Sequence, residues 1–359
     1  MKVYYIGGGY ESCYYVRCLL PLVANGYDGD KTSIRGKRVS PEKMMQGAID
    51  ADVIVYHRPM DSKMLESAKL LKLAGKKIVM DNDDTYSKDS GVPLNMFKGL
   101  KDSLGTIVAS IDKKLKEFAE LADIVTVTTE VLAEEYRAYN KNVVVLKNCV
   151  DPDDWDEPQR NDDGKIRIGI VGSVASNQDY KSIIPLLDIL KDRKDVQLVL
   201  FALPQKSKET ERAVELYRPE FDFWKQYNPE WHSFVAHADY NSKLNDLKLD
   251  IMLIPRFDSY FNRAKSNLKF LEASMCEIPV IAQSFSDGLS PYEVNESDRQ
   301  YMLLASSTDD WITKTLSLID NKEKRLEMGK MAHQYVLKEY NIHSNAHLWD
   351  NEYRKLCEQ

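Results

Sequence analysis

Short apolar segments of strand length alternate along this chain with longer segments of helical periodicity, and this alternation restricts the fold more than any other feature. A parallel sheet needs a crossover, usually a helix, between successive strands, so alternation of this kind predicts parallel α/β structure. In the first part of the chain the strand-like segments are 3–6, 53–56, 77–80, 124–127 and 143–146. Helical patterns over 12–24 and 130–139 separate them.

The pattern stops once and then starts again. Residues 151–164 are rich in Asp and contain almost no apolar residue besides Trp155, a composition typical of a linker. Further strand-like segments follow at 166–171, 197–201, 251–254 and 279–282. The sequence therefore predicts two Rossmann-like parallel-sheet domains, over 1–152 and 165–340, and a helix over 341–359 that packs back on the first domain.

The composition allows two full cores and gives no sign of a membrane span. Apolar residues make up 43% of the 359 residues, as in ordinary globular proteins. No apolar segment approaches the ~20 residues of a transmembrane helix, and the first residues lack the pattern of a secretory signal. The five cysteines form no CxxC pair, which suits a reducing compartment. We expect a cytoplasmic protein, with membrane association left open.

A glycine-rich segment follows the first strand, at the carboxyl edge where parallel sheets bind ligands. Gly8, Gly9 and Tyr10 would allow close approach of a bound group. Ser12 stands where a dinucleotide fingerprint, GxGxxG, requires its third glycine. An NAD site is therefore disfavoured, and a substrate-facing loop or a tight turn without a ligand remains.

Two further polar groups follow the second and third strands. His57 and Arg58 come directly after residues 53–56. His57 could bind or deprotonate a substrate, or it could have no role. Asp81, Asp83 and Asp84 come after residues 77–80. Their carboxylates could bind a divalent metal and match a DxD pattern, although Asp also caps helices and forms turns. We expect all five side chains to lie where the first domain meets a substrate, without a bound metal.

The segment NRAKSNLKFLE is the most informative part of the chain. Lys265 and Lys269 lie four residues apart, which predicts a shared helix face. Lys265, Ser266 and Asn267 would lie at the amino-terminal end, where free amides and the helix dipole favour an anion such as diphosphate. Glu272 would lie on the same face and accept hydrogen bonds from ribose hydroxyls. A solvated amphipathic helix is the alternative.

Several segments resemble glycosyltransferase family 4 and its relatives with the two-Rossmann GT-B fold. The segments ADIVTVTTEVL from Ala122 and NCVD from Asn148 are similar to family elements of the first domain, and LEASMCEIPVIA from Leu271 is the most specific match. Ala264 and Ser173 depart from the family, which usually has a glutamate and commonly a basic residue there. Both departures resemble a subgroup with the pattern KSxxKxLE.

The resemblance implies a hexosyl- or pentosyltransferase that takes a sugar from a nucleotide-sugar in a cleft between the domains, with retention of configuration. His57 and Lys265 are the candidate catalytic residues. No cofactor is expected, because lysines and a helix terminus would stabilise the leaving diphosphate. The donor would contact Gly172, Ser173, Lys265, Ser266, Asn267, Lys269 and Glu272. The acceptor would lie against Gly8, Gly9, Tyr10, His57, Arg58, Asp81, Asp83 and Asp84.

Other functions stay open: a non-catalytic nucleotide-sugar-binding protein, a nucleoside-diphosphate-sugar epimerase of the same fold, or a phage-type DNA-base glycosyltransferase. The acceptor could be a glycan, a lipid-linked sugar or another anionic molecule. Lys31, Arg35, Lys37, Arg38 and Lys43, within residues 31–43, predict either a loop that holds an anionic acceptor or a solvated loop. The net charge of −7 disfavours nucleic acid, whereas basic side chains near anionic head groups suit a peripheral membrane contact.

Overall fold

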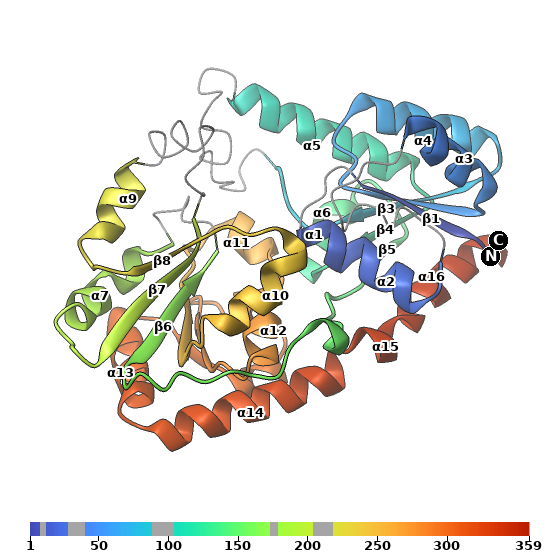
Figure 1. The fold of residues 1–359 in the computed structure, drawn as a ribbon. Helices are drawn as coiled ribbons and strands as arrows, with labels where there is room; N and C mark the ends of the chain where they lie inside the picture. Colours follow the sequence, from blue (N-terminus) through green and yellow to red (C-terminus); the bar gives the residue numbers. More distant parts are fainter. Residues whose placement is uncertain (8–11, 28–39, 88–103, 173–178, 204–217, 359) are drawn as a thin grey trace.

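The chain forms two parallel sheets, each covered by helices on both faces (Figure 1). The computed structural model describes residues 1–7, 12–27, 40–87, 104–172, 179–203 and 218–358. The first sheet has the order β1-β2-β3-β4-β5. Its strands are β1 (Val3–Gly7), β2 (Val53–His57), β3 (Lys77–Asn82), β4 (Ile124–Val127) and β5 (Val143–Val145).

The second sheet has the order β11-β10-β9-β6-β7-β8, and its described strand pairs are parallel as well. Its strands are β6 (Ile166–Val171), β7 (Val196–Leu203), β8 (Glu230–Ser233), β9 (Ile251–Ile254), β10 (Val280–Gln283) and β11 (Leu303–Ala305). The α/β prediction with two Rossmann-like sheets is therefore confirmed.

Helices connect the strands within each half. In the first half they are α1 (Ser12–Tyr14), the π-helical turn η1 (Tyr15–Leu19), α2 (Leu20–Ala24), α3 (Pro41–Asp50), α4 (Ser62–Leu73), α5 (Leu104–Leu121) and α6 (Glu130–Arg137). In the second half they are η5 (Lys181–Ile183), α7 (Ile184–Leu190), α9 (Arg218–Lys225), α10 (His237–Asp246), α11 (Tyr260–Ala264), α12 (Leu268–Met275), η6 (Asp298–Tyr301), α13 (Thr308–Ile319) and α14 (Lys322–Glu339). The chain ends with α15 (Ile342–Asn345) and α16 (His347–Glu358), and a short turn, η4 (Pro152–Asp154), opens the linker.

Polar residues before the helices determine where several of them begin. The side chains of Asp61, Thr129, Ser307 and Asn321 accept hydrogen bonds from backbone amides in the first turns of α4, α6, α13 and α14. Each such cap satisfies an amide that has no partner within the helix and contributes ~1 kcal/mol.

Two separate cores fill the space on either side of the first sheet. On one face, Tyr56 and Met80 of the strands pack with Phe118 of α5. On the other face, Val3 and Tyr5 of β1 pack with α2 and with residues of the carboxyl-terminal helix α16. Burial on both faces explains why these strands are continuously apolar. The strands thereby hold the polar residues that follow them at one edge of the sheet.

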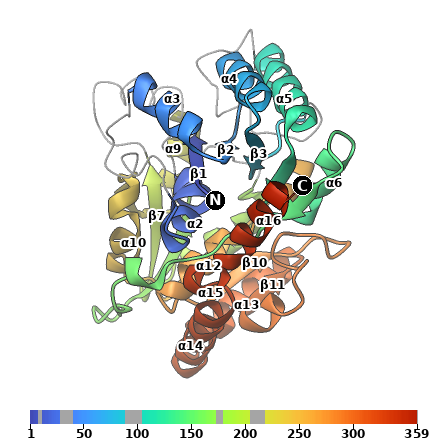
Figure 2. The same cartoon turned by 90° about the vertical axis from the view of Figure 1, so that its right-hand side faces the viewer.

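The chain passes between the halves twice, at neighbouring positions. The amide of Val150 donates to the carbonyl of Tyr340 at 2.9 Å, and the amide of Ile342 donates to the carbonyl of Val150 at 2.9 Å. After this crossing α16 runs beside the first sheet, so the two chain termini lie together (Figure 1, Figure 2). Within the described ranges, none of the helices has the length and apolar content that crossing a membrane would require.

Candidate functional site

Lys269, Glu272 and Tyr240 form a hydrogen-bonded cluster at the start of α12. The Lys269 ammonium donates to Oε2 of Glu272 at 2.8 Å and contacts the Tyr240 hydroxyl at 2.7 Å. The Tyr240 hydroxyl donates to the same Oε2 at 2.8 Å. Burial, reinforced by the Glu272 carboxylate, holds the pKa of Tyr240 well above its usual value, so the phenol remains a donor. The cluster is a preorganised polar site on a buried helix.

Gly172 brings the end of β6 to this cluster. Its φ of +131° lies in a region that side chains rarely adopt. A Cβ added to Gly172 would lie 3.9 Å from Cε of Lys269, so the glycine backbone passes directly beside the lysine. The predicted donor residues Gly172, Lys269 and Glu272 are therefore neighbours. Ser173, the next predicted donor residue, lies outside the described residues.

The predicted shared helix face of Lys265 and Lys269 is wrong. Ser259 caps α11, which ends at Ala264, and Lys265 then adopts an extended backbone with φ −64° and ψ 154°. The next helix, α12, begins only at Leu268. Lys265 therefore lies at a break between two helices, while Lys269 lies in the first turn of α12.

Ser266 and Asn267 fill the rest of this break, and their side chains already have protein partners. Ser266 Oγ accepts from Nδ2 of Asn148 at 2.9 Å. Asn267 Nδ2 donates to Oδ2 of buried Asp298 at 2.7 Å, and the Asn267 side chain does not cap α12. The Ser266 hydroxyl accepts in this bond and keeps its own proton to donate to a ligand. The backbone amides that begin α12 could bind a ligand as well.

His57, Arg58, Asp83 and Asp84 form a charged network at the carboxyl edge of the first sheet. Asp83 Oδ1 lies 3.3 Å from Nε2 of His57 and accepts from Nε of Arg58 at 2.5 Å. Asp84 Oδ2 accepts from Nη2 of Arg58 at 3.0 Å, and its Oδ1 is paired with Lys265. The network thus runs from the first half across to the second.

The protonation of Asp83 follows from these neighbours. Burial opposes its ionisation, but the Arg58 guanidinium and His57 outweigh burial and hold the pKa of Asp83 well below its usual value. His57 is 2% exposed, and its Nδ1 has no hydrogen-bond partner among the described residues. A buried imidazole nitrogen without a partner is costly and marks a candidate contact for a ligand.

Asp81, in contrast, is part of the interior and not of the acceptor side. Its carboxylate accepts from Nε and Nη2 of Arg17 at 3.1 and 2.6 Å, and from Oγ1 of Thr126 at 2.7 Å. The ion pair is fully buried, with side chains 0% and 1% exposed. The position after β3 predicted an edge residue, but Asp81 still belongs to the strand.

Each carboxylate of the predicted acidic cluster is thus paired with a cation: Asp81 with Arg17, Asp83 with Arg58, and Asp84 with Arg58 and Lys265. A divalent ion bound there would have to displace these partners. Asp151, Asp153 and His343 come together at the surface near the linker, but all three are exposed or half-buried, so they do not form an enclosed metal site.

His237 was not predicted from the sequence. It begins α10, and its ring lies 4.2 Å from the ring of Tyr15 in the first half, between centroids. Burial, opposed by the Glu272 carboxylate, lowers the pKa of His237, so the ring is neutral near pH 7. No local pattern marks this residue, because its neighbours come from distant segments. The pair Tyr15–His237 borders the Lys269 cluster from the side of the first half.

The remaining predicted residues lie outside the described part of the chain. These are Gly8, Gly9 and Tyr10 after β1, and the basic residues Lys31, Arg35, Lys37 and Arg38. The end of the predicted basic loop is wrong, because Ser40 caps helix α3 and Lys43 lies in its first turn.

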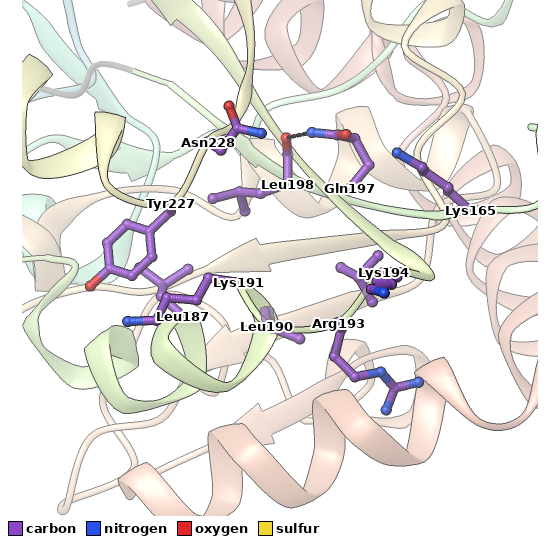
Figure 3. A pocket seen from close by; sticks show the side chains of 11 residues that line it. Lys165, Leu187, Leu190, Lys191, Arg193, Lys194, Gln197, Leu198, Tyr227 and Asn228 are labelled. Atoms are coloured by element: carbon purple, nitrogen blue, oxygen red, sulfur yellow. Dashed lines mark hydrogen bonds between the residues drawn. The ribbon is translucent and has the colours of Figure 1, made fainter.

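A cavity of about 350 Å³ lies at the opposite end of the second sheet (Figure 3). It is lined by Leu187, Leu190 and Tyr227, with basic residues around them. Arg193 at its rim is already paired with Asp195 at 2.6 Å. The cavity adjoins the amino-terminal end of β7, whereas sheets of this kind bind ligands beyond the carboxyl ends of their strands. We therefore leave it out of the candidate site.

Residues 187–351 match the family model described as Glycosyl transferase-like. No curated protein sequence matches the chain.

Among solved structures, the chain is similar to sucrose-phosphate synthase from Thermosynechococcus elongatus, with 16% identity, 100% of both chains covered and a TM-score of 0.62. It is also similar to HepE from Anabaena in complex with UDP, with 12% identity, 99% of this chain and 100% of HepE covered and a TM-score of 0.64. A Listeria monocytogenes protein described as a UDP-N-acetylglucosamine 2-epimerase has 13% identity, with 96% of this chain and 93% of that chain covered and a TM-score of 0.51. At these identities the likeness concerns the fold. The chain has the GT-B fold, and its residues 187–351 are similar to the glycosyl transferase-like family.

Proposed function

We propose that the protein transfers a sugar from a nucleotide-sugar, held by the second half, to an acceptor held by the first half. The observation that carries the proposal is the Lys269–Glu272–Tyr240 cluster beside the backbone of Gly172. Oε2 of Glu272 takes both bonds of the cluster, so Oε1 is left to accept from ribose hydroxyls. HepE, which has the same fold, binds UDP and UDP-glucose.

The chemistry would be electrostatic. When the bond between sugar and diphosphate breaks, negative charge grows on the leaving diphosphate. Lys265, Lys269 and the amino-terminal end of α12 would stabilise that charge. Because these groups are already in position, little reorganisation is needed during the reaction. We propose retention of configuration from the family resemblance alone. No side chain in the described cluster is placed as a nucleophile toward the sugar, so retention would proceed without a covalent glycosyl-enzyme intermediate.

On the acceptor side, His57 is the residue we assign to the reacting hydroxyl. Asp83 remains ionised. In the tautomer in which Nε2–H of His57 donates to Asp83, Nδ1 carries a lone pair. That nitrogen would accept the hydroxyl proton or orient it. Arg58 is engaged with Asp83 and Asp84, so it supports the network. An anionic or glycan acceptor fits here, and a peripheral membrane acceptor remains part of the proposal.

The test is turnover with UDP-, GDP- and ADP-sugars, with and without glycan and lipid-linked acceptors. We expect release of nucleoside diphosphate that depends on an acceptor, together with a glycosylated product. Interconversion of the nucleotide-sugar without an acceptor would instead identify an epimerase, the second candidate, which the similarity to the Listeria protein favours. Binding without either reaction would identify a non-catalytic binder.

We expect turnover to be independent of divalent metal. The cations that would neutralise the leaving diphosphate are side chains, and the carboxylates Asp83 and Asp84 are already paired. Treatment with EDTA followed by gel filtration should therefore leave the rate unchanged. Loss of the rate with EDTA and its return with Mn²⁺ would mean that the acidic cluster binds metal after all.

A further inference from the structure

Lys265 and Asp84 form an ion pair that joins the two halves of the molecule. Lys265 lies between α11 and α12 of the second half, and Asp84 follows β3 of the first half. The Asp84 side chain is 7% exposed, whereas that of Lys265 is 28% exposed. The acid is therefore held in the interior, whereas the lysine side chain is partly accessible to solvent.

Residues on both sides of Lys265 are also bonded to the first half. The carbonyl of Ala264 accepts from Oγ1 of Thr129 at 3.0 Å. Ser266 Oγ accepts from Asn148 at 2.9 Å. Three successive residues of the second half, 264 to 266, thus bind the first half. This short segment is a fixed contact between the halves, and not a loop that happens to lie close.

The ammonium of Lys265 is restrained from two directions. Asp84 accepts one of its hydrogen bonds, and the ring centroid of Phe261 lies 4.1 Å from Nζ, a cation–π contact. A lysine ammonium has three donors, so hydrogens remain for a ligand. Free lysines lose much rotamer freedom when they bind a ligand, and here much of that freedom is already lost.

The charge of Asp84 is balanced from its other side. Its Oδ2 accepts from Nη2 of Arg58 at 3.0 Å, so the carboxylate has a cation on each oxygen. It therefore restrains Lys265 without presenting an unbalanced negative charge to a phosphate.

We propose that Asp84 is a positioning residue for the donor, and not an acceptor contact: it holds the Lys265 ammonium where the donor diphosphate enters. This inference rests on the proposed function, because it takes Lys265 as a diphosphate contact. Ordering of a charged group in advance of binding strengthens the contact it makes. Because Asp84 and Lys265 belong to different halves, donor affinity depends on how the halves are arranged.

The test is a double-mutant cycle on donor affinity, measured by calorimetry with whichever of UDP-, GDP- and ADP-glucose binds the wild type. Asp84→Asn should weaken binding about tenfold, and Asp84→Glu should restore part of the loss. In a Lys265→Met background, Asp84→Asn should cause no further loss, because Asp84 acts through the lysine. Asp112→Asn, which removes a carboxylate paired with Lys116 on α5, is the matched control and should bind normally.

Three outcomes distinguish a failure of the donor role of Lys265 from a failure of the positioning role of Asp84. If Lys265→Met binds donor as well as the wild type, the donor role of Lys265 fails, and the proposed function loses that contact. If Lys265→Met is weak but Asp84→Asn binds normally or more tightly, only the positioning role fails. Equal losses from Asp84→Asn in both backgrounds would show a general structural effect and also overturn it. Thermal unfolding of each variant shows whether the fold is retained, and Lys265→Arg, which keeps the charge, should bind better than Lys265→Met.

Discussion

Replacement of Lys269 by Met is expected to lower turnover by ~10²-fold, the usual cost of removing one preorganised donor from developing negative charge. Lys269 is held by Glu272 and Tyr240, and its chain lies against Gly172. The variant keeps the length of the side chain and removes only the ammonium. Initial rates at saturating donor measure the effect.

The matched control is Lys338→Met, since this lysine lies on the surface of α14 and is 81% exposed. It should turn over at the wild-type rate. Lys269→Met with a wild-type rate would mean that the cluster supports the fold of α12 and does not contact the donor.

Arg17→Leu is expected to destabilise the protein by ~3–5 kcal/mol, because it leaves the carboxylate of Asp81 buried without its cation. Arg17 and Asp81 are fully buried, and two guanidinium nitrogens of Arg17 donate to the Asp81 carboxylate. The double replacement Arg17→Leu with Asp81→Leu should recover much of the loss, since it leaves no unpaired charge. Chemical denaturation, followed by circular dichroism, measures the differences.

Lys116→Leu serves as the comparison. The pair it breaks with Asp112 is partly exposed to solvent, with side chains 27% and 16% exposed, so the cost should be much smaller, ~1 kcal/mol. Equal stability of Arg17→Leu and Lys116→Leu would contradict the structural role assigned to Asp81.

Most strands could be predicted, and the exceptions have a physical reason. Strands β6 and β9 have the predicted ends, because an apolar segment buried on both faces is visible in sequence. Strand β8 (Glu230–Ser233) was missed: it lies at an edge, is only partly buried and has no apolar run. Strand β11 (Leu303–Ala305) was missed because three residues at the other edge are too short to form a pattern.

The site could be predicted only where local spacing determines it. Lys269 and Glu272 are one helical turn apart, and the structure brings them together as the helical period requires. Lys265 could not be placed, because the break before α12 depends on capping by Ser259 and on Asp84 from the other half. The interior role of Asp81 depends on Arg17, which lies 64 positions away. Pairings of this kind leave no periodic signal in a single sequence.

The central claim is that the second half binds a nucleotide-sugar at the start of α12. A crystal structure of the complex with the tightest-binding member of the UDP-, GDP- and ADP-glucose panel tests it most directly. We expect the diphosphate to lie against the first turn of α12, within hydrogen-bonding distance of Lys269, and the ribose to contact Glu272. A donor bound instead in the cavity lined by Leu187, Leu190 and Tyr227, at the opposite end of the second sheet, would contradict it.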